Sequence, residues 1–241
     1  MKENKYDDPA FFEAYSHFPR SVEGLSAAGE WEAFQRMLPN LEGRRVLDLG
    51  CGFGWHCRYA AEHGAAQVTG CDISQKMLAV AREKTDSDNI TYIQTAIEDV
   101  DFPAASFDVV LSSLAFHYVE DFGAICAKVY RLLSTGGDFV FSVEHPIFTA
   151  QGVQDWYYDE DGKPLHWPVD NYFFQGKRET VFLGEQVIKY HKTLTSYVGS
   201  LLQAGFILTD LVEPQPPQRF QGNMAQELRR PMMMLLAAHK I

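Results

Sequence analysis

The sequence feature that most constrains the fold is the run from Val46 to His56, V-L-D-L-G-C-G-F-G-W-H. It begins with a short apolar segment, typical of a buried parallel strand, and then passes through three glycines spaced two residues apart. Glycine tolerates positive φ and lets the backbone approach a ligand closely. A second strand is expected over residues 67–72, ending in Asp72, 24 residues after Asp48. An acid there can accept both hydroxyls of a ribose, so the first inference is a nucleoside-containing ligand.

Two common nucleotide motifs are absent from the sequence. The glycine spacing differs from the G-x-G-x-x-G of pyrophosphate binding, and no G-x-x-x-x-G-K-[ST] occurs. The run instead resembles the cofactor loop of the class I S-adenosylmethionine-dependent methyltransferases, in which the acid ending the second strand binds the ribose. The resemblance is strong over residues 44–143 and looser over residues 193–239.

The resemblance implies a fold and an activity. The expected fold is α/β and Rossmann-like: a seven-stranded mixed sheet of order 3-2-1-4-5-7-6 with an antiparallel last strand, helices on both faces and an aromatic-rich β insertion after strand five. Alternating strand and helix patterns from residue 44 independently favour a parallel sheet covered on both sides. The expected activity is methyl transfer from S-adenosyl-L-methionine to an oxygen or nitrogen of a small organic acceptor by in-line displacement, with S-adenosyl-L-homocysteine as product.

The resemblance also implies which residues hold the cofactor. Tyr15 and Arg20 could reach its carboxylate, Arg20 through charge-assisted hydrogen bonds. The alternative is a packed tyrosine and a solvated arginine. Ile73 and Met77 would flank the adenosine or belong to the core, and Glu98 would lie near the exocyclic amine of the base. The full set of cofactor-binding candidates is Tyr15, Arg20, Asp48, Gly50, Cys51, Gly52, Gly54, Asp72, Ile73, Met77, Ala96, Ile97, Glu98 and Ser113.

The methyl-transfer site is expected beyond the carboxyl ends of the strands, where ligands bind in open α/β sheets. His117 follows the predicted fourth strand and is either a base or substrate-orienting group, with an ordinary pKa near ~6.5, or a hydrogen-bonded wall residue. His145 is the second catalytic candidate. The substrate-binding candidates are Tyr118, Glu144, Trp156, His191 and Tyr197.

The chain divides into four expected parts: a helical cap (1–43), the cofactor-binding core (44–144), an insertion (145–190) and the completion of the sheet (191–241). The insertion is rich in aromatic residues, with a hairpin predicted around Asp161-Gly162 and further strands possible at residues 172–174 and 181–190. Such aromatics can form a lid that grips an organic substrate or a cationic amine. A satellite core or a dimer interface is the alternative.

Charge and composition limit the kinds of binding partner and the location that we expect for this protein. A formal charge of −11 disfavours nucleic acid, and four cysteines without a C-x-x-C pair indicate reduced thiols and no metal site. The start lacks the apolar core of a signal peptide, and no run reaches the ~18 apolar residues of a membrane helix. We therefore expect a cytoplasmic monomer or homodimer. Two alternatives stay open: a regulatory protein that binds the cofactor without turnover, and an NAD-dependent oxidoreductase, which the glycine spacing opposes.

Overall fold

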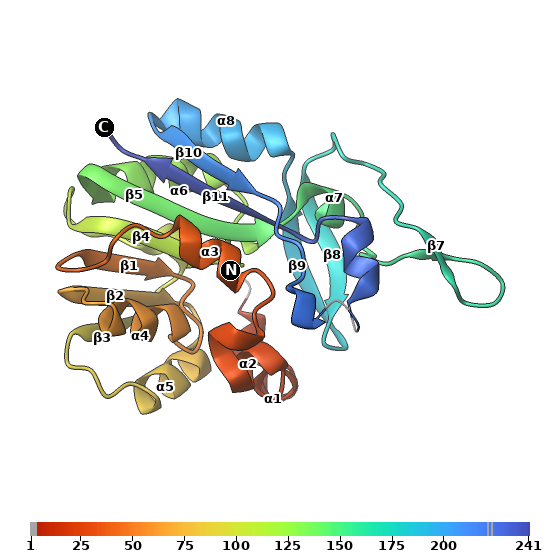
Figure 1. The fold of residues 1–241 in the computed structure, drawn as a ribbon, viewed down its shortest axis with the longest axis horizontal. Helices are drawn as coiled ribbons and strands as arrows, with labels where there is room; N and C mark the ends of the chain where they lie inside the picture. Colours follow the sequence, from red (N-terminus) through yellow and green to blue (C-terminus); the bar gives the residue numbers. More distant parts are fainter. Residues whose placement is uncertain (1–3, 221, 223) are drawn as a thin grey trace.

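The computed structural model describes residues 4–220, 222 and 224–241 and centres on one seven-stranded sheet (Figure 1). In chain order its strands are β1 (Arg45–Leu49), β2 (Gln67–Asp72), β3 (Ile90–Gln94), β4 (Phe107–Ser113), β5 (Leu133–Glu144), β10 (Ile207–Val212) and β11 (Met233–His239). Their spatial order is β10-β11-β5-β4-β1-β2-β3, and β11 is antiparallel to both of its neighbours. Because β10 and β11 are the sixth and seventh strands of this sheet, the predicted order 3-2-1-4-5-7-6 is confirmed.

Helices cover both faces of the sheet, because successive residues of each strand point to opposite sides and both sides are buried. In β1, Val46 packs with one helical layer and Leu47 with the other. The first layer contains α3 (Trp31–Met37), α4 (Trp55–Glu62) and α5 (Gln75–Glu83), and the second contains α6 (Phe122–Leu132) and α8 (Leu194–Ala204). The predicted α/β class is therefore confirmed. In the described part of the chain, no helix is long and apolar enough to span a bilayer.

The N-terminal segment folds into short helices beside the cofactor loop. It comprises η1 (Lys5–Asp7), α1 (Pro9–Ser16), α2 (Pro19–Glu23) and η2 (Gly24–Ala27), followed by α3. The stretch 15–25 has no clear hydrophobic period, and the structure shows why: two short helical pieces meet there. Pro19 begins α2, and Gly24 ends it with a φ of +67°, a conformation that favours glycine.

The insertion contains α7 (Pro146–Thr149) and two hairpins, β6 (Tyr157–Tyr158) with β7 (Pro164–His166) and β8 (Gly176–Phe182) with β9 (Glu185–His191). The predicted hairpin around Asp161-Gly162 is the first of these, and it projects from the body of the molecule (Figure 1). Residues 172–174 form a turn and not a strand, because the guanidinium of Arg178 donates hydrogen bonds to the carbonyls of both Asn171 and Phe174. The second hairpin, β8–β9, lies beyond the carboxyl end of β5 (Figure 1).

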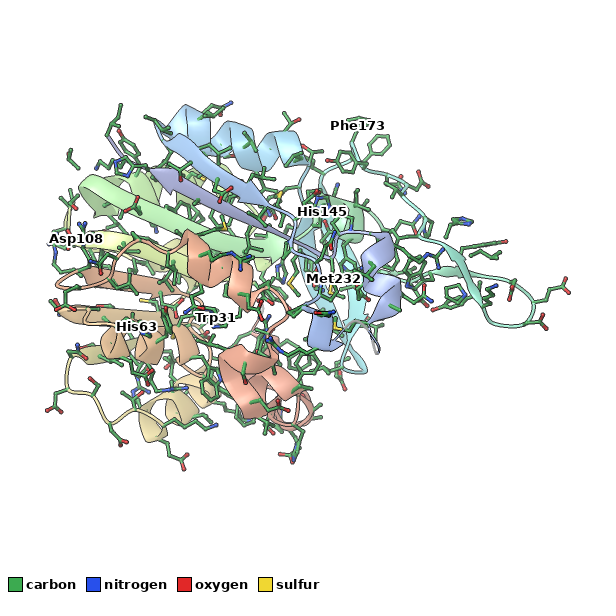
Figure 2. The ribbon with its side chains drawn as sticks, in the orientation of Figure 1. Trp31, His63, Asp108, His145, Phe173 and Met232 are labelled. Carbon is green, nitrogen blue, oxygen red and sulfur yellow. The ribbon has the colours of Figure 1, made fainter. Side chains whose placement is uncertain are left out.

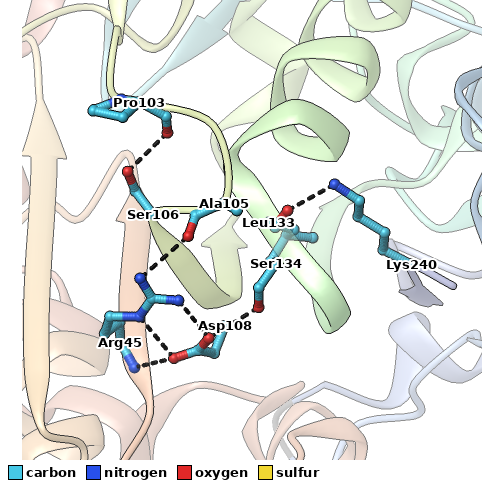
Figure 3. A network of polar contacts seen from close by, with 8 residues as sticks. All are labelled: Arg45, Pro103, Ala105, Ser106, Asp108, Leu133, Ser134 and Lys240. Atoms are coloured by element: carbon cyan, nitrogen blue, oxygen red, sulfur yellow. Dashed lines mark hydrogen bonds and ion pairs between the residues drawn. The ribbon is translucent and has the colours of Figure 1, made fainter.

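A polar network joins the starts of β1, β4 and β5 at the amino end of the sheet (Figure 3), whereas the glycine loop follows the other end of β1. The Asp108 carboxylate, at the start of β4, accepts hydrogen bonds from the backbone N–H and Nε of Arg45 (both 3.0 Å) and from its Nη2 (2.7 Å). The hydroxyl of Ser134 donates to the same carboxylate (2.9 Å), and Arg45 also donates to the carbonyl of Ala105. Both carboxylate oxygens therefore have partners, and the network fixes β1, β4 and β5 to one another.

Candidate active site

The glycine loop leaves β1 in a conformation that its glycines make possible. Gly50, Gly52 and Gly54 all have positive φ, at +77°, +51° and +72°. A Cβ on Gly50 would lie 2.5 Å from the Cβ of Ala115, and one on Gly54 would lie 2.2 Å from the hydroxyl of Tyr92. The loop is thus a backbone cradle in which side chains at Gly50 and Gly54 would clash, whereas Gly52 has open space beside it.

Asp72, at the carboxyl end of β2, faces this cradle. Its Oδ2 accepts a hydrogen bond from the backbone N–H of Gly52 and its Oδ1 from that of Ser74, both at 2.8 Å. A carboxylate has about four lone-pair sites, so each oxygen can still accept a bond from a ligand hydroxyl. The N-terminal segment lies alongside: Asp7 accepts from the hydroxyl of Ser74 (2.6 Å) and the backbone N–H of Lys76 (3.0 Å).

Asp48 lies beneath the loop and is almost fully buried, with 1% of its surface exposed. The thiol of Cys57 donates to its Oδ2 over 3.4 Å, whereas its Oδ1 has no partner among the described residues. Burial raises the pKa of the Asp48 carboxyl to about 7. The group therefore titrates near neutral pH.

A cavity opens between the glycine loop and the N-terminal helices. Six predicted cofactor residues line it: Tyr15, Arg20, Gly50, Cys51, Gly52 and Ser113. It is also lined by Ser21, Gly24, Leu25, Ala28, Phe53, Trp55 and His56. Arg20 forms an ion pair with Glu30, which is 3% exposed. The indole N–H of Trp55 is buried and has no partner in the described part of the chain.

The other predicted cofactor residues lie outside this cavity. Met77 is buried in α5, with its backbone N–H bonded to the hydroxyl of Ser74, and the carbonyl of Ile73 accepts from the Gln94 amide. Ala96 precedes the short helix η3 (Ile97–Asp99), which contains Ile97 and Glu98. The side chain of Ile97 approaches to 3.5 Å of the point where a Cβ on Gly50 would lie, so η3 borders the loop.

His117 lies in η4 (Phe116–Tyr118), directly after β4. Leu114, at the turn between them, has a φ of +53°, a strained conformation for a leucine and one that often occurs at functional sites. The His117 side chain is 3% exposed, and its Nδ1 has no partner among residues that the structure describes. Burial lowers the pKa of His117 to about 4, so the imidazole is neutral at pH 7. The adjacent Tyr118 hydroxyl lies 3.2 Å from that of Tyr6.

A buried network of charged and polar groups lies near His117. Lys189 of β9 donates to Oε1 of Glu144 at 2.6 Å, and Gln154 donates to the other Glu144 oxygen at 3.0 Å. The Gln154 carbonyl oxygen in turn accepts from Lys189 (3.0 Å) and from the hydroxyl of Thr180 (2.9 Å). The charges of Glu144 and Lys189 act on the His117 imidazole. The network joins the end of β5, the segment that follows α7, and the β8–β9 hairpin.

Two predicted histidines already have partners for both ring nitrogens. The backbone N–H of Ile147 donates to Nδ1 of His145 (3.1 Å), and Glu213 approaches its Nε2 (2.8 Å). The His191 ring lies 2.8 Å from the hydroxyl of Thr149 and 2.9 Å from the carbonyl of Tyr172. Figure 2 places His145 near the carboxyl end of β5, at the opposite end of the sheet from Asp108. Both rings are therefore engaged by groups of the chain itself, and their predicted roles at the site stay predictions.

Two predicted substrate residues pack elsewhere. Tyr197 is 2% exposed and contacts the ring of Phe122 in the main core. Trp156 contacts the guanidinium groups of Arg229 (4.5 Å) and Arg230 (5.4 Å). Arg230 also lies 4.0 Å from the ring of Trp167 and 4.8 Å from that of Phe148. The aromatics at the base of the insertion thus hold a cation by cation–π contact, and this cation is an arginine of the chain itself.

Several residues at the site were not among the sequence candidates. Lys189 had a usable signal: Val187, Lys189 and His191 alternate along β9, and all three are buried. Glu30 had no such signal, because its partner Arg20 belongs to a stretch without hydrophobic periodicity. Tyr6 had none either, because its partner Tyr118 lies far away in the sequence.

Comparisons with known proteins agree with this geometry. A family model described as a methyltransferase domain matches residues 47–141. The chain is 53% identical to a protein from Listeria monocytogenes assigned as an S-adenosylmethionine-dependent methyltransferase, whose crystal structure matches with a TM-score of 0.85 over 89% of this chain and 99% of that one. An S-adenosylmethionine-dependent methyltransferase from Mesorhizobium loti is 43% identical, with a TM-score of 0.84 over 90% and 100% of the two chains.

A malonyl-[acyl-carrier protein] O-methyltransferase from Enterobacter lignolyticus is 35% identical over 55% of this chain and 51% of its own length. This chain thus spans about half of that relative, whereas it covers the two solved structures almost completely. These likenesses decide against an NAD-dependent oxidoreductase and against a protein that only binds the cofactor. The chain belongs to the class I S-adenosylmethionine-dependent methyltransferases.

Proposed function

We propose that this methyltransferase acts on an oxygen or nitrogen of a small organic acceptor, with His117 as the group that contacts the acceptor. The observation that carries the proposal is a buried imidazole directly after β4 whose Nδ1 has no partner in the part of the chain that the structure describes. In open α/β sheets, ligands bind at this end of the strands. Buried polar atoms are nearly always hydrogen-bonded, so an unpartnered one in a site suggests contact with a ligand.

The residues present fit S-adenosylmethionine. Asp72 retains lone pairs for two ribose hydroxyls, and Gly52, which lines the cavity with open space where a Cβ would lie, lets a ligand approach its backbone closely. Arg20 offers a cation, while Oδ1 of Asp48 and the indole N–H of Trp55 are polar atoms without protein partners in the described chain. The sulfonium of this cofactor supplies an already activated methyl group. The protein therefore contributes mainly alignment and exclusion of water, which can lower a barrier by ~7–11 kcal/mol.

The proposed role of His117 is to accept a proton from the acceptor or to orient it. Because the pKa of His117 is about 4, its ring is neutral at pH 7 and has a free lone pair. General-base catalysis typically contributes ~10²–10⁴-fold to the rate. The nearby pair of Glu144 and Lys189 supplies one negative and one positive charge, which could orient a polar acceptor.

The acceptor is proposed to be small because two segments of the chain cover the site. The N-terminal segment and the β8–β9 hairpin meet above it: Lys5 pairs with Glu185 at 3.0 Å, and the ring of Phe182 contacts those of Phe11 and Phe18. Such a roof favours a small molecule over a macromolecule, and the formal charge of −11 disfavours nucleic acid. A cytoplasmic monomer or homodimer completes the proposal.

The test is a methyl-transfer assay with S-adenosylmethionine and a panel of carboxylic acids, phenols and amines, with S-adenosylhomocysteine as the measured product. With a phenol or amine acceptor, we expect His117→Gln to lower kcat by about 10²-fold while the Kd of S-adenosylhomocysteine changes by less than about twofold. The matched control is His63→Gln, at an exposed histidine that follows α4 and not β4.

Two results would contradict the proposal. A wild-type protein that binds the cofactor but produces no S-adenosylhomocysteine with any class of acceptor would exclude a small-molecule substrate of these kinds. A His117→Gln variant with wild-type kcat on phenols and amines would remove the histidine from the mechanism.

A further inference from the structure

Lys192 lies immediately after β9 and is a buried lysine, with 4% of its surface exposed. Its ammonium donates hydrogen bonds to two backbone carbonyls, that of Val119 and, over 3.2 Å, that of Tyr190. It also lies 5.8 Å from the ring centre of Tyr190 and 6.0 Å from that of Tyr197. Burial of an ammonium is costly, and neutral carbonyls offset this cost less than a carboxylate would. The placement of this lysine therefore needs an explanation.

The carbonyl that Lys192 binds belongs to the end of η4, the short helix that contains His117. Val119 is the C-cap residue of η4, two residues after His117. A single turn of this kind has few internal hydrogen bonds, so contacts with other elements must fix its orientation. Leu114, with its positive φ, sets the direction of the chain before η4, and Lys192 ties the far end of η4 to the end of β9. The His117 ring lies between these two fixed points.

The charge of Lys192 also acts on the His117 ring. Three charged groups influence the imidazole: Glu144 of β5, Lys189 of β9 and Lys192. The carboxylate favours a protonated ring, whereas the two ammonium groups oppose protonation. Glu144 and Lys189 pair with each other at 2.6 Å, so their effects on the ring oppose one another. Lys192 adds a further positive charge that favours the neutral ring.

The remaining ionisable groups around this pair are acids and tyrosines. The ring of Tyr118 lies 4.4 Å from that of His117, centre to centre. On the other side, Glu120 and Asp121, between η4 and α6, act on the ammonium of Lys192. Both acids favour a protonated lysine, which opposes the effect of burial. Lys192 is therefore held as a cation close to the helix that contains His117.

We propose that Lys192 is a positioning residue for His117: its ammonium fixes the end of η4 and keeps the imidazole in the neutral form that can accept a proton. Lys192 acts through η4 and through its charge, so it is not itself a catalytic residue. The inference rests on the role of His117 in the proposed function. It adds a second requirement to that role, because a base must be both correctly oriented and unprotonated.

The competing explanation is that Lys192 only ties two segments together, and Lys240 provides the comparison. Lys240 donates to the carbonyls of Tyr130 and Leu133, both at 2.7 Å, and lies 4.6 Å from the ring centre of Tyr130. It thus has the same kinds of partner as Lys192, but it follows β11 at the amino end of the sheet, where Figure 3 shows its bond to Leu133. Lys240→Met is therefore the matched control.

The experiment is an NMR pH titration of the histidine rings in the full chain, with the His117 signals identified by their absence from His117→Gln. In Lys192→Met, we expect the pKa of His117 to rise from about 4 to about 5, because a nearby positive charge is lost while Glu144 remains. At pH 5, about half of the His117 rings should then be protonated, against about a tenth in the wild type.

Kinetics on a phenol or amine that the wild type methylates supply the second readout. In Lys192→Met, kcat should fall about tenfold and the acid limb of its pH profile should move up by about one pH unit, while the Kd of S-adenosylhomocysteine changes by less than about twofold. Lys192→Arg keeps the charge, so the pKa of His117 should stay near 4. Lys240→Met should lower Tm without changing kcat or the pKa of His117.

The inference would be overturned by a folded Lys192→Met with an unchanged pKa of His117 or an unchanged kcat, or by an equal rise of that pKa in Lys240→Met. If Lys192→Met does not fold, the wild type decides. Burial lowers the pKa of Lys192 to about 8, so the His117 signals should change again near pH 8, and constant signals there would overturn the inference.

Failure of the inference and failure of the proposed function can be told apart. Wild-type kcat in His117→Gln would remove His117 from the mechanism and overturn both. A reduced kcat in His117→Gln, together with an unchanged pKa of His117 in Lys192→Met, would overturn the inference alone.

Discussion

The two ends of the central sheet differ in how well their buried aspartates are hydrogen-bonded. At the amino end, the Asp108 carboxylate takes four hydrogen bonds, three from Arg45 and one from Ser134 (Figure 3). At the carboxyl end, Asp48 accepts one weak thiol hydrogen bond, and its other oxygen and the Nδ1 of His117 have no partner among the described residues. Two aspartates on neighbouring strands thus have very different surroundings.

The difference also appears in the titration of the two acids. The Arg45 guanidinium holds the pKa of the Asp108 carboxyl well below its usual range, whereas burial raises the pKa of Asp48 to about 7. A carboxylate satisfied by the protein contributes stability, and one left unsatisfied costs stability unless something else binds it. We infer that the aspartate at the amino end stabilises the fold, whereas the aspartate at the carboxyl end is available to a ligand. The following substitutions test this division.

The largest effect is expected for Asp72→Ala, which removes the proposed ribose acceptor. The Kd of S-adenosylmethionine should rise by at least about 100-fold, because two hydrogen bonds to a charged group are lost, each worth ~1.5–3 kcal/mol. The loss of the bonds from Gly52 and Ser74 should cost about 3 kcal/mol of unfolding free energy or less, because burial of the carboxylate, which raises the pKa of Asp72, already offsets part of their contribution. Calorimetry and thermal unfolding measure the two effects separately, and Asp101→Ala, at an 88% exposed side chain, is the control. Wild-type affinity in Asp72→Ala would break the comparison at its carboxyl end.

Asp108→Asn tests the amino end and should have the reverse profile. The unfolding free energy should fall by about 2–3 kcal/mol at pH 7, because the charge partner of Arg45 is lost in a half-buried network, whereas the Kd of the cofactor should stay within about twofold. Because the folded pKa of Asp108 is depressed, its stabilisation is present above the unfolded pKa near ~3.9 and is lost as the pH falls below it. Urea unfolding at pH 7 and pH 3 measures this difference, which should shrink at the lower pH. A variant of wild-type stability at pH 7 would show that the network does not hold the strands.

The cofactor-binding half of the molecule could be predicted from the sequence, because its main features depend on residues close together in the chain. The glycine loop needs positive φ at fixed spacing, and Asp72 ends a strand whose apolar pattern is clear, so both could be placed without a structure. The strand order was then implied by the family that the loop resembles. The Asp161-Gly162 hairpin was equally predictable, because its turn residues carry a strong local signal.

The rest of the site depended on contacts between distant residues, which local patterns do not encode. Trp156 is an aromatic residue in an aromatic insertion, and only the fold reveals that Arg229 and Arg230 already occupy its ring face. His145 follows a strand at the ligand end of the sheet, but Glu213 from the β10–β11 connection takes its Nε2. No local pattern marks Glu30, because its partner Arg20 lies in a stretch with no hydrophobic period.

The smallest effect, and the one of opposite sign, is expected for Asp48→Asn. Because the folded pKa of Asp48 is raised from 3.8 to about 7, the wild type should lose stability as the pH rises from about 4 to about 7, by up to about 4 kcal/mol from this group, and then level off. An asparagine removes this penalty but leaves amide hydrogens without a partner, at a cost of ~1–3 kcal/mol. The net result should be a gain of about 2 kcal/mol at pH 8 and a loss of about 1–3 kcal/mol at pH 4. Urea unfolding of both proteins across this range tests the sign, with Asp101→Asn, at an 88% exposed side chain, as the control. A variant less stable than the wild type at pH 8 would mean that Asp48 is as well satisfied as Asp108, and the two ends of the sheet would no longer differ.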